Sequence, residues 1–411
     1  MSIIISSKGD DVTAWRAAGE FGVLFRQALL DRSALLTSAE FEALAGNVGQ
    51  ELERRAAGHD AALASLRLLI DDVSAATEPG RLGGGIREFY GSCYALLGTN
   101  RSAPAFYRLS EAFLGAVARS ALSCAMGRLD LTPDRLPPLA LIALGPTGRH
   151  EFSPFCNPQL LLVHGEADSL PAELPGMLGL ALHEVFEAAG LSMDPAITPR
   201  NLEWCGTLTQ WRQRLITGLE EGEPSELVDL LRLADQTALL PGNGLEREFQ
   251  DLCLGLLRKS RATLDFLVTR ILGLSNGVGL MGGLRLERSG LHRGLFALFD
   301  HALLPLTASV TALSLMLGGV SVGTPQRIRE LLANGKLNVG MAEHLLEAWH
   351  TLNEFRLAHE GALFPNTEGR LSLYFDPDTL SDGEMERFRE ALEMVDVIKR
   401  HVVITFSGGE E

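Results

Sequence analysis

Apolar residues recur at helical spacing through the first third of the chain. The pattern predicts helices within 11–128, among them a long helix over 102–126. One predicted helical face carries Leu63, Leu66, Ile70 and Val73. Thr37 with Glu40 forms a capping box before another apolar-periodic stretch. A break at Glu78-Pro79-Gly80, then Gly83-Gly84-Gly85, is expected to separate these helices from the next pair.

The pattern changes after the prolines at 133–138. Continuous apolar runs at Leu139–Leu144 and Leu160–Val163 have the length of strands, and a glycine turn lies between them. A helix is predicted over 171–189, and a third strand near Leu191–Met193. The order strand, turn, strand, helix, strand predicts a small mixed sheet set among helices.

From about residue 206 onward the whole chain is predicted to be helical, apart from a loop or short hairpin in 361–380. Thr324-Pro325 is a strong helix start, because a capping hydroxyl precedes proline at the first helical position. The predicted fold class is α+β and mostly α-helical. We divide the chain into an N-terminal helical segment (1–100), a mixed-sheet domain (101–205) and a C-terminal helical domain (206–411).

The composition limits the kinds of partner that the protein can bind and the cellular compartments that fit it. The net charge of −16 argues against broad binding to nucleic acid, which needs a basic surface. Five cysteines without a CxxC pair fit buried thiols in a reducing compartment, so we expect a cytoplasmic protein. The opening MSIIISSKGDD has no basic region and only a three-residue apolar run, so no secretory signal is expected.

Ala302–Pro325 contains no charged residue and is long enough to span a bilayer. Asp300 and His301 precede it directly, and it lacks aromatic anchors and a basic flank. We therefore interpret it as a buried core helix and expect no membrane partner.

Residues 141–164 read LIALGPTGRHEFSPFCNPQLLLVH, an apolar strand that leads through a glycine turn into a second strand. Glycines at such a turn let backbone N–H groups approach phosphate oxygens closely. Two carboxylates one residue apart on the second strand would point to the same face and hold Mg²⁺. At that spacing this chain has Asn157 and Gln159, whose side chains are neutral amides.

This stretch resembles the nucleotidyltransferase family related to the PII uridylyltransferase and the glutamine-synthetase adenylyltransferase. The pattern of that family is roughly G-S-x-G-R-x-E, four residues, then S/T-D-x-D and an apolar strand. The matching positions hold Gly145, Gly148, Arg149 and Glu151. The departures are Pro146 for the serine, Cys156 for the serine or threonine, and Asn157 and Gln159 for the two aspartates. These departures affect the chemistry and leave the scaffold residues in place.

The resemblance implies a nucleotide-binding turn with Glu151 bracing Arg149. The residues that it implies for this turn are Gly145, Thr147, Gly148, Arg149 and Glu151. Asp194 follows the predicted third strand, where this fold often carries its third carboxylate. One acid without the first two does not rebuild a metal site, because amide oxygens carry no charge. We therefore expect no catalytic residues and no bound metal.

Weaker similarities follow in the family's order along the rest of the chain, over about 100–400. They comprise Trp204 with Trp211, Leu230–Asp235, Gly323–Ile328 and Glu354–His359. The last two resemble the family's C-terminal helical domain.

Three functions are compatible with these residues. The first is a catalytically degenerate protein that binds a nucleoside triphosphate weakly, or a regulatory protein, in a regulatory role. The second is an active protein uridylyltransferase or adenylyltransferase with a rebuilt metal site, which would require Mg²⁺. The third is a helical interaction scaffold without a ligand. The apolar helical halves are also compatible with a homodimer.

Overall fold

The computed structural model describes residues 61–133, 136–166, 171, 173–275, 277–279, 282–364 and 373–407. The predicted capping box at Thr37 and Glu40 lies outside these residues. The fold is α+β and 66% helical, with one small four-stranded mixed sheet, which confirms the predicted fold class. The predicted domain boundaries at 100 and 205 stay a prediction.

Two long helices, α3 (Pro79–Asn100) and α4 (Ala103–Arg128), follow a helical segment at 61–74 and confirm the predicted helical start. The chain does break before α3, which begins at Pro79 with Glu78 as its N-cap, but the extension of the break over Gly83-Gly84-Gly85 is wrong, because these glycines lie inside α3. Close packing explains them: a Cβ at Gly83 would lie 2.9 Å from the Ala189 carbonyl oxygen, and one at Gly85 would lie 2.3 Å from Val73 Cγ2.

The sheet has the strand order β3-β2-β1-β4. The predicted strands are β1 (Leu139–Leu144) and β2 (Gln159–His164), which pair antiparallel. β3 (Cys205–Thr207) runs parallel to β2, and β4 (Gln236–Leu240) pairs antiparallel with β1. All six residues of β1 are buried, because helices cover both faces of this central strand.

Two strand predictions are wrong. Leu191–Met193 is a loop, although both named residues are buried, and the Met193 N–H donates to Glu187 instead of joining a ladder. The region after 206 is not all helical, because β4 completes the sheet there. The predicted helix at 171–189 is α6 (Leu174–Ala188).

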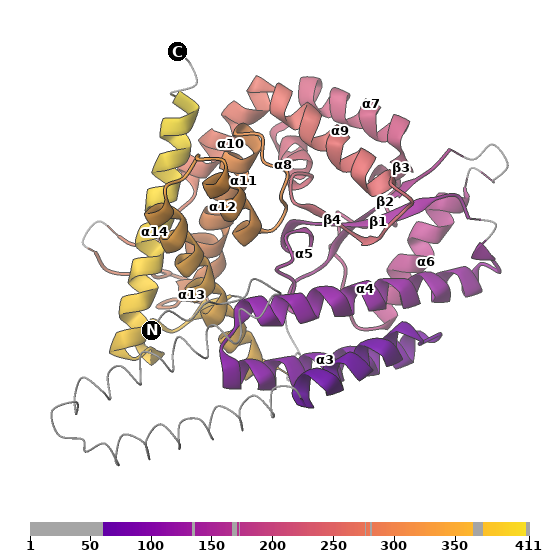
Figure 1. Ribbon diagram of the computed structural model, residues 1–411, viewed down its shortest axis with the longest axis horizontal. Coiled ribbons are helices and arrows are strands. Elements are labelled where there is room, and N and C mark those ends of the chain that lie inside the picture. The colour runs from indigo at the N-terminus through magenta and orange to yellow at the C-terminus, as the bar shows by residue number, and fades with distance from the viewer. Residues whose placement is uncertain are drawn as a thin grey trace, which may run out of the picture.

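The helices form layers around the sheet (Figure 1). On one side, α4 contacts β4 and α6 contacts β3. On the other side, α9 (Leu245–Lys259) contacts β1, β2 and β4, and α7 (Leu208–Glu221) packs on α9. Short elements complete this part: the one-turn helix α5 (Gly145–Gly148), η2 (Leu202–Trp204) and α8 (Pro224–Arg232).

The C-terminal helices form a bundle beside the sheet. Its members are α10 (Arg261–Gly273), the π-helix η3 (Phe299–Leu303), α11 (Leu304–Met316), α12 (Thr324–Ala333), α13 (Val339–Leu363) and α14 (Asp382–Ser407). β6 (Tyr374–Phe375) pairs with β5 (Phe296–Ala297), and η4 (Pro377–Thr379) follows. The described part of 361–380 is therefore no hairpin of its own.

One helical window among the described residues, Phe299–Met316, is long and apolar enough to cross a membrane. Inside the protein 72% of this window is buried. The burial agrees with the interpretation of this segment as a core helix, since a membrane span would present its apolar side chains to lipid.

Candidate functional site at the edge of the sheet

The predicted site lies at one edge of the sheet, where β1 ends and its two neighbours begin. Gln159 of β2 and Gln236 of β4 both stand opposite Leu144, the last residue of β1. The chain turns away from the sheet at this point through the single helical turn α5. The edge therefore gathers the glycine turn, the two amide positions and the residues that precede β4.

The two glycines of the turn are required by its geometry. Gly145 has φ = +60°, in the left-handed region that favours glycine. A Cβ on Gly148 would lie 2.1 Å from the Asp235 carbonyl oxygen and 2.7 Å from that of Ala143. The turn is thus pressed against both β1 and the start of β4, and Thr147 is buried within it.

Gln159 occupies the second of the two positions where the family pattern has an aspartate. Its side-chain Nε2 donates to Asp194 Oδ2 at 3.0 Å. Its Oε1 is buried, has no hydrogen-bond partner among the described residues, and lies 2.8 Å from where a Cβ on Gly145 would be. The amide therefore lies over the glycine turn and places a neutral group where a carboxylate would face a metal ion.

Asp194, the one acid proposed for a residual metal site, already accepts hydrogen bonds from protein groups. Its Oδ1 accepts from the backbone N–H groups of Ala196 and Ile197, both at 2.9 Å, and its Oδ2 accepts from Gln159. Asn157 is half-buried and precedes β2 by two residues. Among the residues that the structure describes, no group of three His, Cys, Asp or Glu side chains is placed to hold a metal ion.

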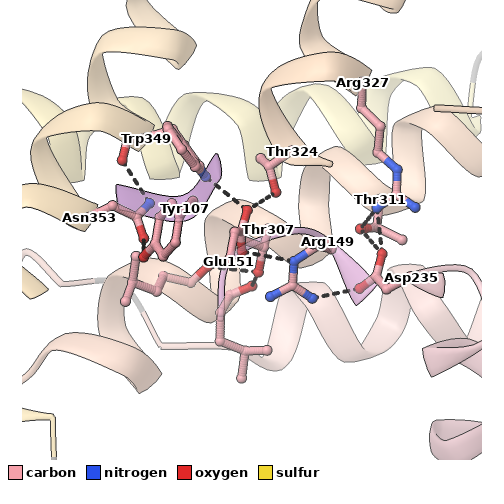
Figure 2. Close-up of polar contacts among 12 residues, drawn as sticks. Tyr107, Arg149, Glu151, Asp235, Thr307, Thr311, Thr324, Arg327, Trp349 and Asn353 are labelled. Atoms are coloured by element: carbon pink, nitrogen blue, oxygen red, sulfur yellow. Dashed lines mark hydrogen bonds and ion pairs between the residues drawn. The ribbon is translucent and has the colours of Figure 1, made fainter. Parts of the chain in front are cut away.

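Arg149 and Glu151 face the C-terminal helices (Figure 2). Arg149 Nε donates to Glu151 Oε2 at 3.0 Å, as the resemblance implied, and its Nη1 donates to Asp235 Oδ2 at 2.6 Å. Glu151 Oε1 accepts from Thr324 of α12 at 2.6 Å and from Trp349 of α13 at 2.9 Å. Both side chains are at least 90% buried and paired with protein groups.

Asp235 ends the segment Leu230–Asp235, which resembles the family, but that resemblance assigned it no role in the site. Its Oδ2 pairs with Arg149, and its Oδ1 accepts from Thr311 of α11 at 3.0 Å and from Arg327 of α12. Burial raises the pKa of this carboxyl, but Arg327 and Arg149 outweigh burial and hold its pKa below the ordinary value. The carboxylate is therefore ionised and shared between two guanidinium groups.

A second buried cluster surrounds Arg356 of α13. Its Nε donates to Glu360 at 2.9 Å, its Nη1 to the Glu151 carbonyl oxygen at 3.2 Å, and its Nη2 to Ser153 and to Cys156 Sγ, both at 2.8 Å. Burial lowers the pKa of this guanidinium, but the neighbouring Cys156 and Glu360 raise it well above its ordinary value. Cys156, at the family's serine or threonine position, is the one cysteine among the five that is only half-buried.

A cavity of about 70 Å³ lies between the turn and these helices. Its lining includes Pro146, Arg149 and Cys156 from the turn side and Leu303, Thr307 and Asn353 from the helices. Pockets for small molecules and cofactors usually have volumes of roughly 300–1,000 Å³. In this conformation the cavity is therefore too small for a nucleoside triphosphate.

Two family models match this chain. One, described as "Putative nucleotidyltransferase DUF294", matches residues 88–225. The other, described as "Putative nucleotidyltransferase substrate binding domain", matches residues 261–406. The chain belongs to this nucleotidyltransferase family. The two matches together cover most of the chain, and no curated protein matches it.

The resemblance of residues 145–163 to nucleotidyltransferases implies a divalent metal ion, and the side chains at the edge of the sheet do not fit one. Mg²⁺ prefers charged oxygen ligands in near-octahedral geometry. The two positions one residue apart offer neutral amides, and the remaining carboxylate accepts three hydrogen bonds from protein groups. We therefore derive no phosphoryl-transfer step through a metal ion at this edge.

Proposed function

We propose that this protein is a catalytically degenerate member of its nucleotidyltransferase family and acts by binding, in a regulatory role in the cytoplasm. The observation that carries the proposal is the Gln159–Asp194 hydrogen bond. A carboxylate accepts hydrogen bonds only, so Gln159 must turn its NH₂ group toward Asp194. The amide thereby satisfies the acid that a metal ion would satisfy in an active enzyme.

The contact between Gln159 and Gly145 supports the same proposal. Phosphate binding at a glycine turn needs an open backbone surface, and here a side-chain amide lies on that surface. Gly145, Thr147, Gly148, Arg149 and Glu151 thus support the shape of the turn. Direct contact with a nucleoside triphosphate would need Gln159 to move aside.

The ligand of this binding protein is a weakly held nucleoside triphosphate or a regulatory protein. The cavity of about 70 Å³ favours a protein partner while the edge is closed. The acidic balance of the chain favours a partner that is not a nucleic acid.

Radiolabelled triphosphates test the proposal. The purified protein would be incubated with a lysate and with ATP, UTP, GTP or CTP labelled at the α-phosphate, with Mg²⁺ or Mn²⁺. We expect no protein to become covalently labelled. Label that depends on Arg149 or Gly148 would show an active transferase and overturn the proposal.

Thermal shifts separate nucleotide binding from protein binding. A ligand that binds only the folded state raises the melting temperature by an amount that grows with its concentration. A saturable shift with one of the four triphosphates shows that the protein binds that nucleotide. If none of the four triphosphates shifts the melting temperature, the ligand of the proposed binding function is a regulatory protein.

A further inference from the structure

The edge of the sheet and the C-terminal helices meet along a seam. We define the seam as the contact of residues 145–157 and Asp235 with α11, α12 and α13. Polar contacts cross it at several points: Thr324 and Trp349 donate to Glu151, Arg327 and Thr311 donate to Asp235, and Arg356 donates to Ser153. Charged and hydrogen-bonded side chains therefore take part in the attachment of these helices to the turn.

Asp235 joins the two sides of the seam. One of its oxygens accepts from Arg149 of the turn, and the other accepts from Arg327 and Thr311 of the helices. Arg327 also donates to Thr311 and to the Ala234 carbonyl oxygen. Figure 2 shows these side chains in one continuous row from Trp349 to Arg327. Loss of the Asp235 charge would leave two buried guanidinium groups without their shared partner.

Packing at the seam is less complete than in the sheet. Every residue of β1 is buried, whereas the seam contains the cavity of about 70 Å³. Side chains that line a void lose the dispersion contacts they would have in a close-packed core. The π-helix η3 supplies Phe299 and Leu303 to one wall, and such wide turns are frequent at functional sites.

We propose that the seam is a latch that Asp235 holds closed. The closed seam keeps Arg149 and Glu151 buried against α11, α12 and α13, and it pairs the half-buried Cys156 with Arg356 of α13. When the latch opens, the contacts of α11, α12 and α13 with the turn separate locally, while the sheet and the core that it shares with these helices through α9 remain folded, and the edge becomes accessible. This proposal does not depend on the proposed function, because a latch over an active site would use the same contacts.

Thiol alkylation of the full-length protein tests the latch. Cys156 lies in the seam, where Arg356 donates to its sulfur, whereas Cys93, Cys124, Cys205 and Cys253 are buried elsewhere. The rate at which a maleimide modifies each cysteine is read by mass spectrometry. Asp235→Asn is expected to speed modification of Cys156 by about tenfold or more, because local opening governs access. The other four cysteines keep their rates.

Two further variants show whether faster modification of Cys156 comes from opening of the seam. Asp72→Asn is the matched control, because Asp72 pairs with Arg81 of α3 and both side chains are exposed to solvent. It should leave all five rates unchanged. Thr324→Val removes one donor to Glu151 and should speed Cys156 modification by a smaller factor. An unchanged Cys156 rate in Asp235→Asn, or equal acceleration of all five cysteines, would overturn the latch, because equal acceleration indicates global unfolding.

Discussion

Gln159 makes the chemical difference at the scale of single residues. It begins β2 at the position where the resembled pattern has an aspartate, and in the proposed function its neutral amide takes the place of that charge. The amide donates to Asp194 and covers Gly145, so one substitution changes both the metal position and the surface of the turn. Arg149 and Glu151 keep their family identities and serve as buried partners of each other.

The fit of Gly148 between β1 and Asp235 predicts a large effect of a single methyl group. Gly148→Ala would place its Cβ 2.1 Å from a backbone oxygen that cannot move without the start of β4. We expect a loss of about 2–4 kcal/mol in the free energy of unfolding, measured by urea denaturation. Gly255→Ala in α9 is the control, because its new Cβ meets nothing within 4 Å. It should be neutral or stabilise by up to about 1 kcal/mol. Equal effects of the two substitutions would contradict the packing.

Asp235 predicts a loss of stability in acid. Its pKa in the folded protein is lowered, because Arg327 and Arg149 outweigh the effect of burial. A carboxyl of this kind contributes stability that is present above its unfolded pKa and is lost as the pH falls through its folded pKa. We expect the free energy difference between the unsubstituted protein and Asp235→Asn to shrink below about pH 4. Urea denaturation at a series of pH values measures this difference, and a difference independent of pH would contradict the ion pairing.

The chemistry of the site residues was partly readable from the sequence. The turn glycines, Arg149, Glu151 and the two amides stand in one short stretch, and its resemblance to the family pattern indicated the candidate site. Asp235 and Arg356 come from distant segments, and only the fold brings them to the turn. Both residues stand in segments that resemble the family, Leu230–Asp235 and Glu354–His359, but nothing in those segments assigned either residue to the turn.

At the scale of elements, the sequence predicted the buried strands and missed the polar or short ones. β1 and β2 are continuous apolar runs between turn residues, a strong strand signal. β3 has three residues, and β4 begins with Gln236 and Thr237 after the helical residues 224–232. Their pairing with β2 and β1 outweighs the weak local preference.

The start of α7 supports a prediction at this scale. Thr207 and Gln210 form a reciprocal capping box, with the Thr207 hydroxyl accepting from the Gln210 N–H. Thr207→Ala removes this acceptor and should cost about 1 kcal/mol of stability in thermal or urea unfolding. Thr217→Ala, at an exposed position of the same helix, should change stability by less than about 0.5 kcal/mol. A Thr207→Ala protein as stable as this control would exclude a contribution of the cap.

At the scale of the whole molecule, the two family matches leave out residues that the fold needs. Residues 226–260 lie between the matches and contain Asp235, β4 and α9. β4 is an edge strand of the sheet, and α9 covers one face of it. The sheet and the C-terminal helices therefore share one continuous core.

This shared core predicts that the segment of the first family match, residues 88–225, does not fold without the rest of the chain. A fragment ending at residue 225 would expose one side of β1 and the face that α9 covers. We expect such a fragment to lack the cooperative unfolding transition of the full chain in circular dichroism, because it cannot bury the apolar residues of β1. A sharp transition in the fragment would show that the sheet is stable without β4.

Binding of Mn²⁺, followed by the loss of its free-ion electron paramagnetic resonance signal, tests the central claim most directly. In the proposed function, two neutral amides have replaced the acids of the metal site. The unsubstituted protein should show no saturable site that depends on Asp194, and the Asn157→Asp, Gln159→Asp double variant should gain one. The control Gln213→Asp, at an exposed position of α7, should gain none. Saturable binding of one Mn²⁺ by the unsubstituted protein, lost in Asp194→Asn, would contradict the claim.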